Sequence, residues 1–346
     1  MFFRDRGAVL QLRFLEDIVH RVLKLLPPEE AHRAGLALLR LRAVRIGETP
    51  RRLRVRTVIG EVSPPVGLAA GFDKTGRHVS SLAALGFGFV VAGSATLQAR
   101  KGNVKPRIVR KGPDGLVNAM GLPNPGVKVF ADNLRREVAR AGIPVVASIA
   151  GSEVRELVEC YEALRGVVAG VEVNLSSPSL SGATRLWSPE FIRELVAELS
   201  TVRWAPIILK VPPLARAELR TQILRAIEIW AGGGMDAVTA VNTLPVEEPR
   251  LSTGFGGLSG RQLKPHMLET VRAASKILEG RCELFAVGGL FTAEDVTEAF
   301  EAGARAVQIY TALALHGPRV VRNIRNGLIK LLDEKGAENI EELFPG

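Results

Sequence analysis

Eight short apolar runs, separated by segments of helical periodicity, restrict how this chain can fold more than any other feature. The runs lie at residues 66–71, 88–94, 144–149, 171–177, 206–211, 236–243, 284–289 and 306–311. Helical patterns lie between them at 75–85, 152–165, 189–201, 215–231 and 264–279, and then at 292–302 and 318–334. Nearly continuous apolar strands are typical of a parallel sheet that is buried on both faces. Eight of them in βα alternation predict a closed (β/α)8 TIM barrel. A doubly wound open sheet is the alternative, but it does not usually need eight consecutive βα units.

Two segments depart from this alternation. Residues 95–130 form a long insertion before the second helix, and their glycine and proline turns predict hairpins over the barrel mouth. Before the barrel, residues 14–26 and about 29–42 each place apolar residues on one helical stripe, with two prolines between them. We therefore predict a small N-terminal helical extension, residues 1–56, and a barrel, residues 57–346.

The positive charge of the chain is concentrated in this extension. The whole chain carries a formal charge of +10, and residues 1–60 contain 13 Lys and Arg against 6 Asp and Glu. A basic excess at one end suggests an anionic partner surface, either lipid or nucleic acid, whereas a solvated arginine-rich face is the simpler alternative. The two amphipathic helices could cap the bottom of the barrel, or they could lie in a membrane interface.

Other sequence features narrow the class of protein. No apolar run reaches the roughly 18 residues of a membrane-spanning helix, and the N-terminus lacks the pattern of a signal peptide. Cys160 and Cys282 do not have the spacing of metal ligands, and two thiols in a chain of this length suit a reducing compartment.

Polar residues and glycines gather where the predicted strands end, on the side of a barrel where sites form. The run 171–177 ends in Asn174 and two serines, and Pro178 then begins a small polar segment that could be a mobile flap or only a surface turn. Gly288 and Gly289 after the seventh strand, with a polar end to the eighth, predict a phosphate cradle. The other candidates at strand ends are Ala70, Gly71, Lys74, Ser94, Lys210, Asn242, Thr243, Tyr310 and Thr311.

This composition points to a particular chemistry. None of the five histidines falls at a strand end, Asp73 is the only acid there, and no metal-ligand cluster is evident. A mouth with lysines, amides and serine suits an organic redox cofactor. A cation near N1 and the C2 carbonyl of a flavin stabilises the reduced ring, and Lys210 is the candidate for that role.

Several motifs in these segments resemble those of the dihydroorotate dehydrogenases, FMN-dependent barrels of pyrimidine synthesis. The resemblance extends from about residue 14 to about residue 334. Its motifs are residues 66–74 (VGLAAGFDK), 105–110 (KPRIVR), 118–121 (NAMG), 174–178 (NLSSP), 256–261 (GGLSGR) and 307–310 (VQIY). Residues 26–32 (LPPEEAH) resemble the helix pair of the class 2 branch, which is membrane-associated and reduces quinone. Ser177 agrees with that branch, because class 1 enzymes typically have cysteine there.

The resemblance implies a role for each motif residue. Ser177 would be the catalytic base, taking the C5 proton of dihydroorotate while C6 gives hydride to flavin N5. Dihydroorotate, and its product orotate, would be bound by Lys74, Asn118, Met120, Gly121, Leu122, Asn174, Ser179, Asn242 and Thr243. FMN would be bound by Ala70, Gly71, Lys74, Ser94, Ser148, Asn174, Lys210, Val241, Gly260, Gly288, Gly289, Tyr310 and Thr311. His32 and Arg110 would line the route of the quinone.

The sequence also departs from the family pattern. Ser179 stands where the family has asparagine, Ser148 stands where class 2 enzymes usually have asparagine, and residues 122–124 (LPN) replace a Phe-Asn-Asn run. Three alternatives to the class 2 activity follow. They are a soluble class 1-like enzyme that uses fumarate or a partner flavoprotein, a flavin barrel that acts on RNA, and a barrel that binds FMN without catalysis.

We expect the quinone-dependent enzyme, with no nucleic acid partner and no metal. We also expect it to be attached peripherally, through its extension, to the cytoplasmic side of the cell membrane.

Overall fold

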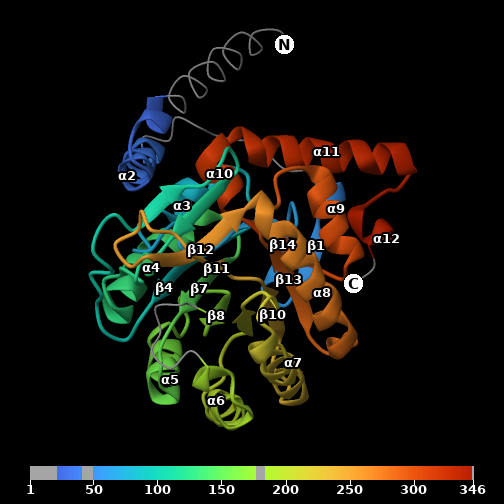
Figure 1. Ribbon diagram of the computed structural model, residues 1–346. Helices are drawn as coiled ribbons and strands as arrows, with labels where there is room; N and C mark the ends of the chain where they lie inside the picture. The colour runs from blue at the N-terminus through green and yellow to red at the C-terminus, as the bar shows by residue number, and fades with distance from the viewer. Residues whose placement is uncertain (1–21, 41–49, 177–183, 345–346) are drawn as a thin grey trace.

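The computed structural model describes residues 22–40, 50–176 and 184–344, and its centre is a closed parallel barrel (Figure 1). The barrel strands, in order, are β3 (Val66–Leu68), β4 (Phe89–Ala95), β7 (Val145–Ile149), β8 (Gly170–Asn174), β9 (Ile207–Val211), β10 (Ala237–Ala240), β13 (Glu283–Val287) and β14 (Ala306–Ile309). Each strand pairs in parallel with its neighbours, and β14 pairs with β3 to close the ring. The predicted TIM barrel is confirmed, and the open doubly wound sheet is wrong.

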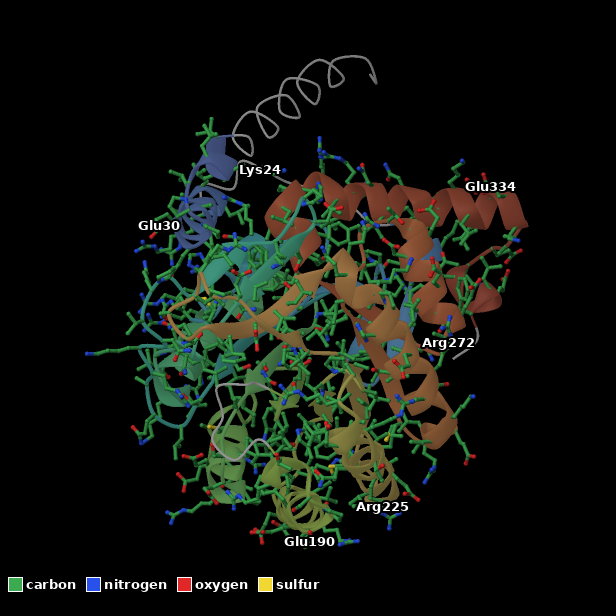
Figure 2. All side chains as sticks on the ribbon, in the orientation of Figure 1. Lys24, Glu30, Glu190, Arg225, Arg272 and Glu334 are labelled. Carbon is green, nitrogen blue, oxygen red and sulfur yellow. The ribbon has the colours of Figure 1, made fainter. Side chains whose placement is uncertain are left out.

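Helices cover the outside of the barrel, one after nearly every strand (Figure 1). They are α3 (Val79–Ala83), α4 (Val127–Ala141), α5 (Val154–Ala163), α6 (Pro189–Thr201), α7 (Ala217–Gly232), α8 (Lys264–Leu278), α9 (Ala293–Glu301) and α11 (Arg319–Lys335). Two short helices that the sequence analysis missed are α10 (Thr311–His316) and α12 (Ile340–Leu343). Charged side chains such as those of Glu190, Arg225 and Glu334 point outward from the helices into solvent (Figure 2).

The bottom of the barrel is closed by aromatic side chains and by a short hairpin. Phe89 and Phe285 are fully buried, with ring centroids 5.9 Å apart. The hairpin consists of β1 (Val55–Thr57) and β2 (Gly60–Val62), and the amide of Val58 at its turn donates to Oε2 of Glu283 over 2.9 Å. Glu283 begins β13, so this hairpin covers the N-terminal ends of the strands.

A four-stranded antiparallel sheet lies over the mouth of the barrel, and we call it the lid sheet. Its order is β11 (Leu244–Glu247), β12 (Phe255–Gly260), β6 (Gly115–Asn118) and β5 (Ile108–Arg110). The predicted insertion supplies β5 and β6, whereas the chain after β10 supplies the other pair, which the sequence analysis missed. A Cβ on Gly257 would lie only 1.8 Å from Oγ1 of Thr243, so glycine permits the close approach of β12 to the end of β10.

Helix α2 (Pro28–Leu39) belongs to the predicted N-terminal extension and agrees with the helix expected at about 29–42. It lies against the lid sheet, because Arg107 and Arg110, beside and on β5, bond to residues of α2 and of the chain just before it. The possibility that this helix caps the bottom of the barrel is therefore wrong, since the hairpin occupies that place. Of the helix expected at 14–26, only residues 22–26 are described, and residues 22–25 are helical.

Within the described ranges, no helix is long and apolar enough to cross a membrane. The described His, Cys, Asp and Glu side chains also form no group of three that could hold a metal ion.

Candidate active site

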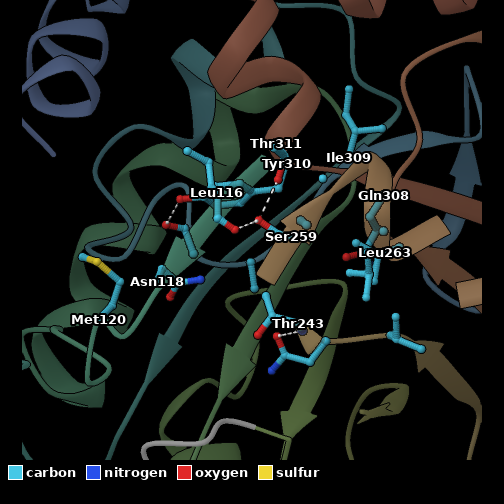
Figure 3. A pocket seen from close by; sticks show the side chains of 18 of the residues that line it. Leu116, Asn118, Met120, Thr243, Ser259, Leu263, Gln308, Ile309, Tyr310 and Thr311 are labelled. Carbon is cyan, nitrogen blue, oxygen red and sulfur yellow. Dashed lines mark hydrogen bonds between the residues drawn. The ribbon is translucent and has the colours of Figure 1, made fainter. Parts of the chain in front are cut away.

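A deep pocket opens at the C-terminal ends of the barrel strands, beneath the lid sheet (Figure 3). Its empty volume is about 1230 Å³ when the open mouth is included. A pocket at the C-terminal face of a (β/α)8 barrel is the usual place for the active site of such a fold. Asn118 reaches it from the lid sheet, and Thr243 and Gln308 reach it from the barrel side (Figure 3).

Most of the residues predicted from the sequence meet in this pocket. Those that line it are Ala70, Gly71, Lys74, Ser94, Asn118, Met120, Gly121, Leu122, Asn174, Lys210, Val241, Asn242, Thr243, Gly260, Gly288, Gly289, Tyr310 and Thr311. Ser148 lies directly behind Ser94, with 2.8 Å between their hydroxyl oxygens. His32 and Arg110 lie to one side, on α2 and β5. Ser177 and Ser179 lie outside the described residues.

A chain of hydrogen bonds joins the ends of four strands. The Nδ2 atom of Asn242 donates to Oγ of Ser176 over 3.0 Å, and that hydroxyl donates to Oδ1 of Asn174 over 2.9 Å. The Nδ2 atom of Asn174 then donates to Oγ of Ser94 over 3.0 Å, and Ser94 bonds to Ser148. Both sides of the Asn174 amide are thereby held, so the end of β8 is oriented before a ligand arrives.

Lys74 brings a cation into the pocket from the loop after β3. Burial lowers the pKa of its ammonium to about 8, although the nearby carboxylate of Asp73 acts in the opposite direction. The ammonium donates to the carbonyl of Gly71. Asp73 is itself buried and accepts hydrogen bonds from the backbone amides of Thr75 and Gly76, which orders the loop that carries Lys74. These bonds also explain why α3 begins later than the helix predicted at 75–85.

A second cation, Lys210, lies on the floor of the pocket and is only 5% exposed. Its Nζ is 3.4 Å from a carboxylate oxygen of Glu172. Gln308 also lines the pocket, and its Oε1 atom is buried with no hydrogen-bond partner in the described part of the chain. A buried acceptor without a partner, on a side chain that lines a pocket, is suited to a ligand that donates a hydrogen bond.

Glycines bring three segments together at the other end of the pocket. Gly260, Gly288 and Gly289 have φ angles of 108°, 129° and 77°, which favour glycine. A Cβ on Gly289 would lie 2.6 Å from the backbone nitrogen of Lys264, so the turn after β13 packs tightly against the start of α8. Backbone amides in such turns form an anion-binding concavity.

Three aromatic rings lead from α2 to the pocket. The ring centroids of His32 and Phe72 are 4.7 Å apart, and those of Phe72 and Tyr310 are 5.3 Å apart, with edge-on geometry in both pairs. Tyr310 lines the pocket. Burial, and secondarily the charge of Lys74, lower the pKa of His32 to about 3, so this imidazole is neutral near pH 7.

Sequence reasoning missed several residues of the site. Ser259 and Gln308 were not selected, although Ser259 lies within the motif 256–261 and Gln308 lies within the motif 307–310. Ser176 was noted at the end of the run 171–177 but was given no role. A polar side chain within the apolar run 306–311 was the signal that could have indicated Gln308. The place of Ser259 in the site depends on the pairing of β12 with β6 in the lid sheet, and no local sequence pattern predicts that pairing.

Comparisons with known proteins agree with this geometry. The sequence model of the family described as dihydroorotate dehydrogenase matches residues 52–332. A dihydroorotate dehydrogenase (quinone) of Thermus thermophilus is 34% identical over 94% of this chain and 99% of that protein. One of Deinococcus radiodurans is 32% identical over 94% and 98%. A crystal structure of a DHODH from Eimeria tenella in complex with ferulenol has a TM-score of 0.82 at 25% identity, covering 92% of this chain and 95% of that one.

Proposed function

Because the chain belongs to the dihydroorotate dehydrogenase family, we propose that it oxidises (S)-dihydroorotate to orotate with FMN and passes the electrons to a quinone, in the synthesis of pyrimidine nucleotides. The observation that carries the proposal is the convergence of two lysines, three asparagines and a glycine cradle in one pocket. Relatives named dihydroorotate dehydrogenase (quinone) match nearly the full length of the chain, which supports the quinone as acceptor.

The pocket residues are suited to FMN. Gln308 presents an unpaired acceptor, Lys210 presents a cation, and the glycine turns at Gly260, Gly288 and Gly289 present backbone amides to a phosphate. The predicted FMN residues Ala70, Gly71, Lys74, Ser94, Asn174, Val241, Tyr310 and Thr311 would complete the site, with Ser148 behind Ser94. When bound there, FMN supplies the hydride-accepting and electron-carrying chemistry.

The substrate would lie between Lys74 and the amides. A carboxylate is a natural partner for the Lys74 ammonium, and binding it would favour the charged form of that lysine. Asn118, Asn174 and Asn242 each offer a donor and an acceptor, which suits the alternating N–H and C=O groups of a pyrimidine ring. Thr243, Met120, Gly121 and Leu122 would surround the ring, and Ser179 would add a hydroxyl.

Ser177 is the proposed base that removes the C5 proton. A serine hydroxyl is a weak base by itself, so it depends on exact placement and on a route for the proton. The hydrogen bonds that hold Asn174 and Ser176 secure the chain immediately before it. We propose that this rigid support is what lets the following segment present Ser177 to the substrate.

The quinone would approach past α2. The neutral imidazole of His32 and the guanidinium of Arg110 flank this side, and Arg110 Nη2 donates to the carbonyl of Leu26 over 3.0 Å. The apolar side chains of Leu25 and Leu38 are 84% and 40% exposed, which suits contact with lipid. We propose that residues 1–56 form an extension that attaches the barrel, residues 57–346, peripherally to the cytoplasmic face of the membrane.

Two alternative functions are less well supported. A flavin barrel that acts on RNA relies on a cysteine acid, but Cys160 and Cys282 are both buried, and burial raises the pKa of their thiols to about 12 and about 11. Neither is among the described residues that line the pocket. A class 1-like enzyme that uses fumarate or a partner flavoprotein would not need α2 beside the mouth of the barrel.

Anaerobic mixing with dihydroorotate tests the proposal. We expect purified protein to carry FMN, to lose its yellow colour on mixing, and to regain it with a quinone but not with fumarate. A Lys74→Met variant is the matched control, because it should keep the fold but bind dihydroorotate weakly. Reoxidation by fumarate alone would favour the class 1-like alternative, and failure to bleach would leave a flavin-binding barrel without this activity.

A further inference from the structure

Glu172 is a buried carboxylate that the proposed chemistry does not use. It lies on β8 two residues before Asn174, on the same inward face of the strand, and it is 0% exposed. One of its oxygens is 3.4 Å from Nζ of Lys210, and the other has no hydrogen-bond partner among the described residues. Buried carboxylates are normally well paired and hydrogen-bonded, so a single long contact requires an explanation.

Lys210 stands between Glu172 and the pocket. Lys210 lines the pocket, whereas Glu172 is absent from the described residues that do so. In the parallel ladder Asn174 is opposite Lys210 and Glu172 is opposite Ile208, so the carboxylate lies one step farther from the mouth. The ammonium therefore has the carboxylate on its inner side and the ligand space on its outer side.

Stability alone does not account for this arrangement. A buried ion pair is often no more stabilising than apolar side chains of similar volume, because both charges lose their hydration. The pair does have an electrostatic effect on the pocket. A carboxylate this close to Lys210 offsets much of the positive potential that the lysine would otherwise project, and in a buried site this offset is only weakly screened.

Resting on the proposed function, in which Lys210 presents its cation to the flavin, we propose that Glu172 is a positioning residue that sets the reduction potential of the bound flavin. Uptake of a hydride adds two electrons and one proton to FMN, and so adds one negative charge. Lys210 stabilises that charge, and Glu172 opposes it while holding the ammonium at the pocket floor. Glu172 thereby lowers the midpoint potential, which favours the onward transfer of electrons to the acceptor.

Spectroelectrochemical titration of the FMN-loaded protein tests this role. We expect Glu172→Gln to raise the midpoint potential by about 30 mV or more, since tenfold in the equilibrium of a two-electron couple corresponds to that shift. Binding of oxidised FMN to the apoprotein, measured by flavin fluorescence, should change much less, because the oxidised ring is neutral. Glu172→Asp keeps the charge but withdraws it from Lys210, so it should shift the potential in the same direction by a smaller amount.

Thr239→Val is the matched control. Thr239 is the partner of Lys210 in the ladder on β10, is fully buried, and carries no charge, so its replacement should leave the potential unchanged. An unshifted or lowered potential in yellow, folded Glu172→Gln would overturn the inference and leave the proposed function intact. If that variant does not fold, the same measurement on Glu172→Asp decides. A wild-type protein that takes up no FMN would instead overturn the proposed function and, with it, this inference.

Discussion

Helices α11 and α2 are both amphipathic, but they are attached to the molecule in different ways. Helix α11 buries Val320, Val321, Ile324, Leu328 and Leu332 against the barrel. Helix α2 buries no residue completely. Its half-buried Leu36 and Leu39 touch the main core, and His32 packs edge-on against Phe72. Burying an aliphatic side chain contributes about 1.5–3 kcal/mol, so α11 is secured by its apolar face.

Polar contacts hold α2 instead. Arg107 makes two hydrogen bonds to Glu29, of 2.7 Å and 3.2 Å, and Lys105 pairs with Glu30 at 3.2 Å. Pairing with Arg107 lowers the pKa of Glu29. Polar contacts thus orient α2 on the protein while much of its apolar surface stays free for another partner, such as a lipid or a quinone.

The largest expected effect is on the reduction of the flavin inside the barrel, away from α2. Ser177→Ala should slow flavin reduction by dihydroorotate by about 10²–10⁴-fold, the usual contribution of a positioned base. Reoxidation of chemically reduced protein by quinone should be unchanged, because α2 and its surroundings are intact. Stopped-flow absorbance separates the two half-reactions. An Ala variant within a few-fold of wild type would identify another residue as the base, whereas Ser177→Cys should keep part of the rate.

Leu328→Ala tests whether burial of its apolar face is what holds α11 to the barrel. The side chain is fully buried, so we expect a loss of about 2–5 kcal/mol in the free energy of unfolding. Leu38→Ala on α2 is the matched control, because that side chain is 40% exposed, and it should change stability little. Urea denaturation followed by circular dichroism measures both. Equal losses would contradict the difference that we describe between the helices.

Removal of residues 1–43, which include α2, tests the proposed role of the extension in quinone reduction and membrane attachment. Flavin reduction by dihydroorotate should survive, whereas quinone turnover and binding to anionic vesicles should fall by about an order of magnitude, since the segment that we propose to contact the membrane is lost. The thermal midpoint of the truncated protein checks that the barrel remains folded. Normal turnover with quinone, together with normal binding to vesicles, would show that the extension has neither role.

The pH dependence of orotate binding should follow the charge of Lys74 in the barrel pocket. Because the pKa of Lys74 is lowered to about 8, its side chain is a charged ammonium below that pH and a neutral amine above it. The affinity for orotate should therefore be highest below pH 8 and should weaken by up to about tenfold per pH unit above it. A flat profile between pH 7 and 9.5 would exclude Lys74 as the partner of the carboxylate.

The smallest expected effect is the loss of one attachment of α2. Glu29→Gln removes the charge-paired bonds to Arg107 and should weaken the docking of α2 by about 1 kcal/mol, with less effect at high salt. We expect faster proteolysis within residues 22–40 and a modest rise in the KM for quinone. Limited proteolysis and steady-state kinetics measure these two effects. Glu30→Gln is the control, because Glu30 is more exposed and should matter less. A change in the KM for dihydroorotate would contradict the separation of the two sides.

Local patterns in the sequence predicted much of this protein. The βα alternation determined the barrel, because apolar strands that are buried on both faces leave few other architectures. Strand-end positions such as Lys74, Asn174 and Lys210 could be identified because the C-terminal ends of parallel strands must meet on one side. Most boundaries differ by a few residues, since positions such as Gly71 and Asn242 leave the ladder to line the pocket.

Three features were decided only by tertiary structure. The pairing of β12 with β6 completes the lid sheet, the contacts of Arg107 and Arg110 bring α2 to the mouth, and the inward direction of β8 places Glu172 beneath Lys210. Periodicity along a chain reports which side chains avoid water, because burial repeats with the geometry of the element. It carries no information about which distant segment supplies the partner, because pairing between segments depends on chain topology and on side chains that meet only after folding.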